Sequence, residues 1–221
     1  MGECDRRTMM LGASAMLSMA TQAQGSASAA TIPGTQSDAL IDLWPDGPPG
    51  APKPLPSELV QERSTDPAAP DRALLHIARP RLALFRAPHP NGAAMLVMPC
   101  GGYNYVVIGK EGYEIGPWLA ARGVSAFILF YRLPQEGWAA GPDVALSDAQ
   151  RAMRLIRHRA EELSLDANRV GAMGFSAGGH VCADLATRFG ARTYAPVDAA
   201  DGLSARPKVA APIYPVISMH R

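Results

Sequence analysis

The sequence predicts an α/β fold with a mostly parallel, doubly wound sheet, and three observations support this. Short continuous apolar runs, typical of strands buried on both faces, recur at 93–98, 124–131 and 170–175. Apolar residues at helical spacing fill the intervals, most clearly over 143–165. The motif Gly174-Phe175-Ser176-Ala177-Gly178 marks a sharp turn from the last run into a helix. Because strands and helices alternate at crossover length, the strands are expected to be parallel.

Four further elements complete the expected pattern. They are a strand at 81–86, a helix at 111–122 closed by Gly123, a helix at 177–189 and a last strand at 209–217 interrupted by Pro212 and Pro215. In the 143–165 helix we expect Arg151, Arg154 and Arg157 to form a solvated face. Asp148 lies on the same helix and is expected to anchor it or a nearby loop.

Residues 1–30 have the character of an export signal. Arg6-Arg7 precede a weakly apolar stretch at 9–20, which is followed by small residues, and cleavage is expected near Ala27-Ser28-Ala29. The arginine pair resembles a twin-arginine signal, which predicts a periplasmic or secreted protein. The alternative is a disordered N-terminus in which the arginine pair has no significance.

The remaining chain divides by composition. Residues 31–72 are rich in proline and glycine and are expected to be extended, irregular wrapping chain. Residues 73–221 hold the regular apolar pattern and are expected to form one domain.

Composition excludes several classes of partner. The formal net charge is +1, which does not indicate binding to nucleic acid. No run after the N-terminal segment is apolar enough to span a bilayer. The three cysteines match no zinc pattern, and Cys100 and Cys182 are expected to be free thiols. No metal or organic cofactor is implied.

Ser176 is the candidate catalytic nucleophile. A strand-to-helix turn holds such a serine in a strained conformation and directs its hydroxyl out of the sheet. The helix N-terminus offers unpaired N–H groups to a developing oxyanion. The alternative is a glycine-rich turn that contains an incidental serine.

A second motif, Pro99-Cys100-Gly101-Gly102-Tyr103, follows the 93–98 strand. In folds with a nucleophile turn, this position supplies the other oxyanion donor, and glycines let the backbone approach a substrate carbonyl. By itself a Gly-Gly pair after a strand indicates only a loop. Upstream of the 174–178 motif, it favours an oxyanion site.

The sequence from residue 40 onward resembles the α/β-hydrolase esterases of the acetyl esterase and acetylxylan esterase-like type, relatives of the hormone-sensitive-lipase group. Besides the two motifs above, the matching stretches are Leu43-Trp44-Pro45-Asp46-Gly47, Tyr131-Arg132-Leu133, Asp148-Ala149-Gln150-Arg151-Ala152, Gly179-His180 and Tyr214-Pro215-Val216-Ile217-Ser218. The resemblance implies that Ser176 is the nucleophile and that the N–H groups of Gly101, Gly102 and Ala177 form the oxyanion hole. The family usually has a third glycine where this chain has Cys100, whose side chain is expected to crowd the pocket.

The triad acid and base are not present at their expected positions. In this family they follow later strands, and we expect the fold to lack its last strands. His180 is interpreted as structural, because helical spacing places it one turn beyond Ser176. His220 with Asp198 or Asp201 has the right chain order, but lacks intervening elements to direct it toward Ser176. His76, His89 and His158 are expected at the surface, in a turn or in packing.

The resemblance implies a serine esterase that hydrolyses short-chain, mainly acetyl, esters on a small molecule or a carbohydrate such as xylan. The alternative is a catalytically incompetent fragment or remnant of such an esterase. A serine peptidase of similar fold is a third possibility, disfavoured because a chain of 221 residues leaves no room for the large propeller domain that such peptidases usually add. With neither acid nor base in place, the 221-residue chain is expected to be a very poor esterase.

Overall fold

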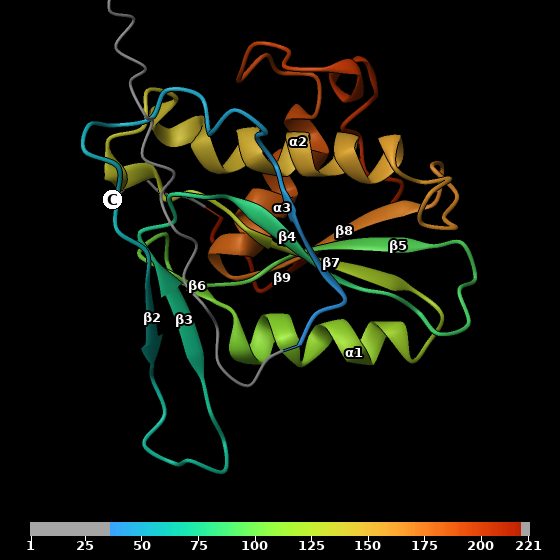
Figure 1. The fold of residues 1–221 in the computed structure, drawn as a ribbon, viewed down its shortest axis with the longest axis horizontal. Helices are drawn as coiled ribbons and strands as arrows, with labels where there is room; N and C mark the ends of the chain where they lie inside the picture. The colour runs from blue at the N-terminus through green and yellow to red at the C-terminus, as the bar shows by residue number, and fades with distance from the viewer. Residues whose placement is uncertain (1–35, 218–221) are drawn as a thin grey trace, which may run out of the picture.

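The computed structural model describes residues 36–217 as an α/β sandwich around one central sheet (Figure 1). The export signal predicted on residues 1–30 and the candidate base His220 lie outside the described residues. The sheet has six strands in the order β1-β4-β7-β5-β8-β9. Their bounds are Ala39–Asp42, Arg81–Phe85, Ser125–Phe130, Ala94–Met98, Val170–Phe175 and Ala210–Ile213, respectively.

The centre of the sheet is parallel, as the alternating pattern predicts. Strand β5 pairs in parallel with both β7 and β8, and β8 pairs in parallel with β9. Strands β1 and β4 are antiparallel additions at the other edge. Helix α1 (Ile115–Ala120) covers one face, and α2 (Val144–His158) and α3 (Ala177–Arg188) cover the other (Figure 1).

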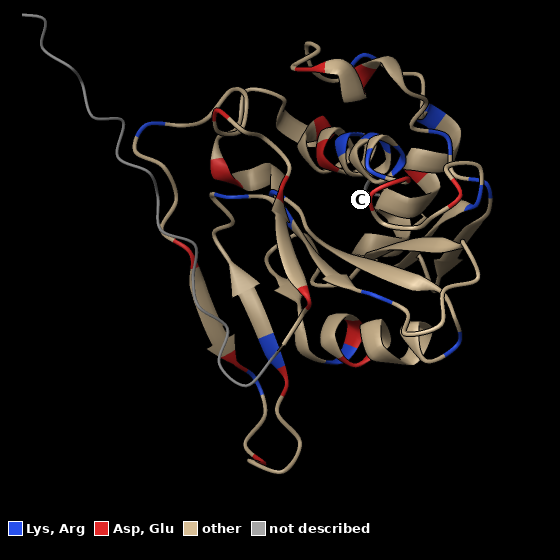
Figure 2. Ribbon diagram, turned by 45° about the vertical axis from the view of Figure 1, so that its right-hand side comes forward, with Lys and Arg blue, Asp and Glu red and all other residues tan. Residues whose placement is uncertain are grey.

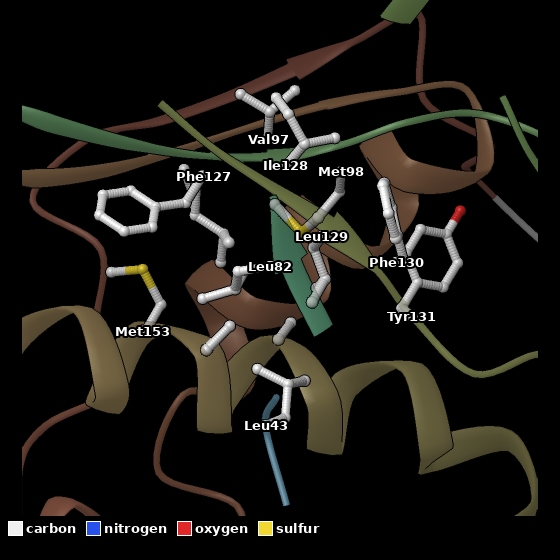
Figure 3. Packing of buried hydrophobic residues seen from close by; sticks show 14 of the residues in the cluster. Leu43, Leu82, Val97, Met98, Phe127, Ile128, Leu129, Phe130, Tyr131 and Met153 are labelled. Atoms are coloured by element: carbon white, nitrogen blue, oxygen red, sulfur yellow. The ribbon is translucent and has the colours of Figure 1, made fainter. Parts of the chain in front are cut away.

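The core fills the space between the sheet and α2. Figure 3 shows Leu82 and Phe127 from the sheet beside Met153 of α2, with Leu43 of the N-terminal segment close by. These four side chains are fully buried. Burying a side chain of this size stabilises the fold by about 1.5–3 kcal/mol. The apolar residues of the strands and of α2 therefore pack against one another between these elements, as their spacing predicts.

The 31–72 segment contains more regular structure than its composition predicts. Strands β1 and β2 (Leu59–Glu62) lie inside it, and β2 joins β3 (Arg72–Leu75) and β6 (Val106–Val107) in a separate three-stranded antiparallel sheet. The expectation of wholly irregular chain is wrong for these residues. Both strands fall in stretches without proline, 34–44 and 57–66, so every backbone N–H remains available for pairing.

Three elements have other bounds than the sequence predicts. The 111–122 helix is a π-helical turn, Gly109–Tyr113, followed by α1, and Gly123 ends it with a φ of +81°. Helix α2 ends at His158, and residues 159–164 form turns. Strand β9 ends before Tyr214, whose φ is +33°. The strand tolerates Pro212 because β9 is an edge strand of the sheet that the described residues form.

The arginines of α2 do not form a solvated face, contrary to the sequence prediction. Arg151 is 1% exposed and pairs with Asp198 (2.5 Å) and Asp201 (3.0 Å). Arg154 donates to the carbonyl of Leu203, and Arg157 donates to the carbonyl of Ala167. The 3₁₀ turn Ala199–Gly202 and its flanking chain lie across α2 and cover the arginines. Long side chains that would otherwise be solvated are thereby used to hold a loop.

Acidic and basic residues are interspersed along the ribbon in Figure 2, in keeping with the net charge of +1. In the part of the chain that the structure describes, no helix has the length and apolar character needed to cross a bilayer.

Candidate active site

The predicted nucleophile turn is present, with Ser176 between β8 and α3. Its backbone has φ 51° and ψ −113°, a conformation that non-glycine residues rarely adopt. The flanking glycines are required. A Cβ on Gly174 would overlap the carbonyl of Gly178, and one on Gly178 would overlap the carbonyl of Met98. Ser176 therefore occupies the strained strand-to-helix turn that a serine nucleophile needs.

Three hydrogen bonds fix the backbone of Ser176. Its N–H donates to the carbonyl of Ile213 at 3.0 Å, at the end of β9. Its carbonyl accepts from the N–H of Val216 at 3.2 Å and from that of His180 at 2.9 Å. The end of β9 and the residues just after it thus hold the candidate nucleophile on both sides of its Cα.

The glycine loop lies beside this turn. Strand β5, which leads into it, is the parallel neighbour of β8, and Met98 is in register with Gly174. The carboxyl ends of parallel neighbours lie at one edge of the sheet, so both motifs leave the sheet together. Gly101 (φ +147°) and Gly102 (φ +60°) adopt conformations that favour glycine.

The predicted oxyanion donors are brought to the same end of the sheet. Ala177 is the first residue of α3, so its N–H has no acceptor within the helix, and the positive end of the helix dipole lies there. Gly101 and Gly102 come from the adjacent loop. Their role as an oxyanion hole with Ala177 stays a prediction.

Two tyrosines stabilise the glycine loop. The hydroxyl of buried Tyr131 donates to the carbonyl of Pro99 at 2.7 Å. The hydroxyl of Tyr103 lies 2.7 Å from Nδ1 of His180, on the nucleophile helix. His180 therefore links the loop to α3, which agrees with its interpretation as a structural residue.

Neither described cysteine is suited to act as a nucleophile. Both are free thiols, as predicted. Burial and a hydrogen bond to Glu111 raise the pKa of Cys100 to about 12. Burial raises the pKa of Cys182 to about 11. Since the thiolate is the reactive form, both remain unreactive near neutral pH.

The other acidic and histidine side chains considered for the triad have different partners or are exposed in the described residues. Asp198 and Asp201 are bound to Arg151 of α2, where they hold the covering segment. His76 pairs with Glu136 at 3.1 Å, and His89 and His158 are exposed. Within residues 36–217, Ser176 makes no side-chain hydrogen bond to a histidine. In that same range, no cluster of acidic, histidine and cysteine side chains could hold a metal ion.

The sequence did not predict one contact, which connects the glycine loop with the chain that follows β9. Glu111 accepts the N–H of Cys100 at 2.6 Å and the hydroxyl of Tyr214 at 2.7 Å. The two donors are distant from each other in sequence and belong to different strand ends. No local pattern could have identified this contact.

Comparisons with known proteins agree with this geometry. The family model described as BD-FAE matches residues 109–200. A solved structure of an acetyl ester-xyloside bifunctional hydrolase from Caldicellulosiruptor lactoaceticus is 29% identical, with a TM-score of 0.55 over 80% of this chain and 56% of that one. The chain has an α/β-hydrolase fold and is similar to this acetyl ester hydrolase.

Curated relatives of this α/β-hydrolase point the same way. An acetylxylan esterase from Xylanibacter ruminicola is 31% identical over 63% of this chain and 26% of its own length. An endo-1,4-beta-xylanase B from Butyrivibrio fibrisolvens is 36% identical over 58% and 20%, respectively. A Thermogutta terrifontis esterase, 21% identical with a TM-score of 0.50 over 70% of this chain and 52% of its own, shares the fold. This chain spans 26% and 20% of the length of the two curated relatives and about half of the length of the solved ones.

Proposed function

We propose that this α/β-hydrolase is a serine esterase that hydrolyses short-chain, mainly acetyl, esters through a Ser176 acyl-enzyme. The strained turn at Ser176 carries the proposal, because it lies at the same sheet edge as the Gly101-Gly102 loop. This supports the proposal, because a nucleophile and backbone N–H donors at one sheet edge can act on the same carbonyl group.

The reaction has two steps. The Ser176 hydroxyl oxygen attacks the ester carbonyl while its proton passes to a general base, and the oxyanion accepts hydrogen bonds from the loop and helix amides. Collapse of the intermediate expels the alcohol, which takes the proton. Water then attacks the acyl-serine in the same way and releases the acid and the free hydroxyl. No histidine of residues 36–217 hydrogen-bonds to Ser176, so this proposal assigns the base to none of them.

The proposed substrate is an acetyl group on a carbohydrate such as xylan. The names of two relatives, an acetylxylan esterase and an acetyl ester-xyloside hydrolase, support this choice. Acetate release from acetylated xylan, compared with release of butyrate from a butyrylated analogue, tests the acyl preference. Equal or faster butyrate release would contradict it.

An organophosphonate probe tests the nucleophile. Where a base reaches its hydroxyl, we expect the probe to label Ser176. Any hydrolysis of p-nitrophenyl acetate above background should, like the labelling, be abolished by Ser176→Ala. Ser164→Ala is the matched control, since Ser164 is an exposed serine outside the site. Labelling that survives Ser176→Ala would identify a different nucleophile.

The same assay separates the alternatives. If neither labelling nor turnover occurs, the catalytically incompetent form is favoured, because an unassisted serine hydroxyl is a poor nucleophile. If turnover occurs, His220→Ala tests whether the base lies in this chain. Loss of activity in that variant would assign His220, and unchanged activity would exclude it.

We also propose export through a twin-arginine route to the periplasm or beyond. The Arg6-Arg7 pair before a weakly apolar stretch supports this. Replacing both arginines by lysine should retain the precursor inside the cell, while a reporter with an ordinary secretory signal is still exported. Continued export of the lysine variant would refute the route.

A further inference from the structure

We propose that Glu111 is a positioning residue that holds the oxyanion loop and the nucleophile turn in a fixed mutual arrangement. This inference rests on the proposed function, since it assigns Glu111 to the same site. Its carboxylate joins two loops that belong to different strand ends, one after β5 and one after β9.

The first contact controls the glycine loop. Glu111 Oε2 accepts the backbone N–H of Cys100 at 2.6 Å. Cys100 directly precedes Gly101 and Gly102, the two positions with positive φ. Because a glycine backbone has wide freedom, this anchor adds to the hydrogen bonds at the carbonyls of Pro99, Cys100 and Gly101 in keeping the following N–H groups in one direction.

The second contact controls the nucleophile. Glu111 Oε1 accepts the Tyr214 hydroxyl at 2.7 Å. Tyr214 lies between Ile213, which accepts the Ser176 N–H, and Val216, which donates to the Ser176 carbonyl. One carboxylate therefore connects the chain that directs the oxyanion donors with the chain that holds Ser176.

The chemistry of the site favours a carboxylate here. Both partners are donors, and an ionised carboxylate is an acceptor at both oxygens. A glutamine amide has one acceptor oxygen and one NH₂ group, so it would have to donate to the Tyr214 hydroxyl, and both hydrogen bonds would lose the contribution of the charge. Glu111 lies in the middle of the π-helical turn Gly109–Tyr113, a local geometry often found at functional sites.

Because Glu111 is negatively charged, an electrostatic role and a positioning role predict opposite changes in kcat when the residue is replaced. A negative charge near the site repels a developing oxyanion, so removing it should raise kcat if electrostatics alone mattered. Positioning predicts the reverse. Glu111→Gln should lower kcat about 10- to 100-fold, because a loosened oxyanion donor loses part of its contribution. KM should stay within about threefold, since the ground-state ester makes little use of that donor.

The experiment uses the full chain and two readouts. The first is kcat and KM for p-nitrophenyl acetate. The second is amide hydrogen exchange of the 99–105 peptide, which should be faster in Glu111→Gln, because the Cys100 N–H loses or weakens its acceptor. Glu114→Gln is the matched control, an exposed glutamate three residues further on, and should equal the wild type in both readouts.

A second variant covers the case in which Glu111→Gln fails to fold. Tyr214 is 63% exposed, so Tyr214→Phe removes only a surface hydroxyl. It should lower kcat less than Glu111→Gln does. The double variant should be no slower than Glu111→Gln alone, because both changes break one link.

The outcomes are separable. If the wild type shows no Ser176-dependent turnover, the proposed function fails, and hydrogen exchange alone then decides the role of Glu111 in holding the loop. Unchanged exchange of 99–105 in Glu111→Gln, or in Tyr214→Phe where the first variant does not fold, overturns the proposal. Unchanged or raised kcat in an active enzyme overturns it as well.

Discussion

Replacement of Asp148 tests how strongly the fold depends on one buried charge. Asp148 and Arg132 are both 0% exposed and form an ion pair at 2.8 Å. Asp148 also accepts the indole N–H of Trp44 at 2.9 Å and the backbone N–H of Arg132 at 2.9 Å. The structure thus confirms that Asp148 anchors its helix, and joins α2 to the chain after β7 and to the N-terminal segment.

The size of the effect follows from the burial. In Asp148→Ala the Arg132 guanidinium stays buried, with the carbonyl of Pro49 as its remaining acceptor. Leaving one member of a buried pair uncompensated costs about 3–5 kcal/mol. For a domain of about 150–250 residues, each kcal/mol shifts the melting temperature by about 2–4 °C. The expected fall in melting temperature is therefore about 6–20 °C.

Thermal unfolding followed by circular dichroism measures this fall. Glu162→Gln is the control, since Glu162 belongs to the exposed pair with Arg159 and should leave the melting temperature unchanged. The double variant Arg132→Met, Asp148→Leu should recover much of the loss, because it removes both charges. A melting temperature for Asp148→Ala within 2 °C of the wild type, or a double variant less stable than Asp148→Ala, would refute the reasoning.

Three further predictions concern the glycines, the acid range and the thiol. Gly178→Ala should abolish Ser176 labelling and destabilise the fold in urea titration, whereas Gly190→Ala, whose added Cβ meets nothing within 4 Å, should do neither. The hydrogen bond from Arg151 lowers the pKa of Asp198 to about 2, so its stabilising contribution is complete above about pH 4 and disappears as the pH falls toward 2. In Asp198→Asn the free energy of unfolding should therefore change less over this pH range than in the wild type. An unchanged pH dependence would contradict this. With a pKa of about 12, Cys100 should react with iodoacetamide at pH 8 about a thousandfold more slowly than in the urea-unfolded chain, and comparable rates would show that the thiol is not shielded.

The sheet edge also bears on these measurements. In the described residues β9 pairs on one side only, with β8. Its neighbours Val209, Tyr214 and Ile217 are 58%, 63% and 85% exposed. An unpaired edge with apolar neighbours favours association of chains. Unfolding measurements should therefore be made at low protein concentration.

Local patterns in the sequence were enough to predict the parallel core strands and the Ser176 turn. Strand β8 lies at the residues expected from its apolar run, 170–175. The strain at Ser176 follows from a short-range requirement, because a strand that turns directly into a helix permits few conformations and needs glycines beside it. Periodicity and turn chemistry are properties of neighbouring residues, so they can be read from one segment at a time.

The tertiary structure alone decided which polar side chains are buried and what they contact. Arg151 has the spacing of a solvated helix residue, yet a segment about 50 residues later covers it and supplies its acids. Glu111 gains its role because β5, β8 and β9 are neighbours in the sheet, so that their loops meet at one edge. Strand order brings together residues that are distant in sequence, and a solvated arginine and a buried one have the same local sequence pattern. Their difference arises only when another part of the chain packs against them.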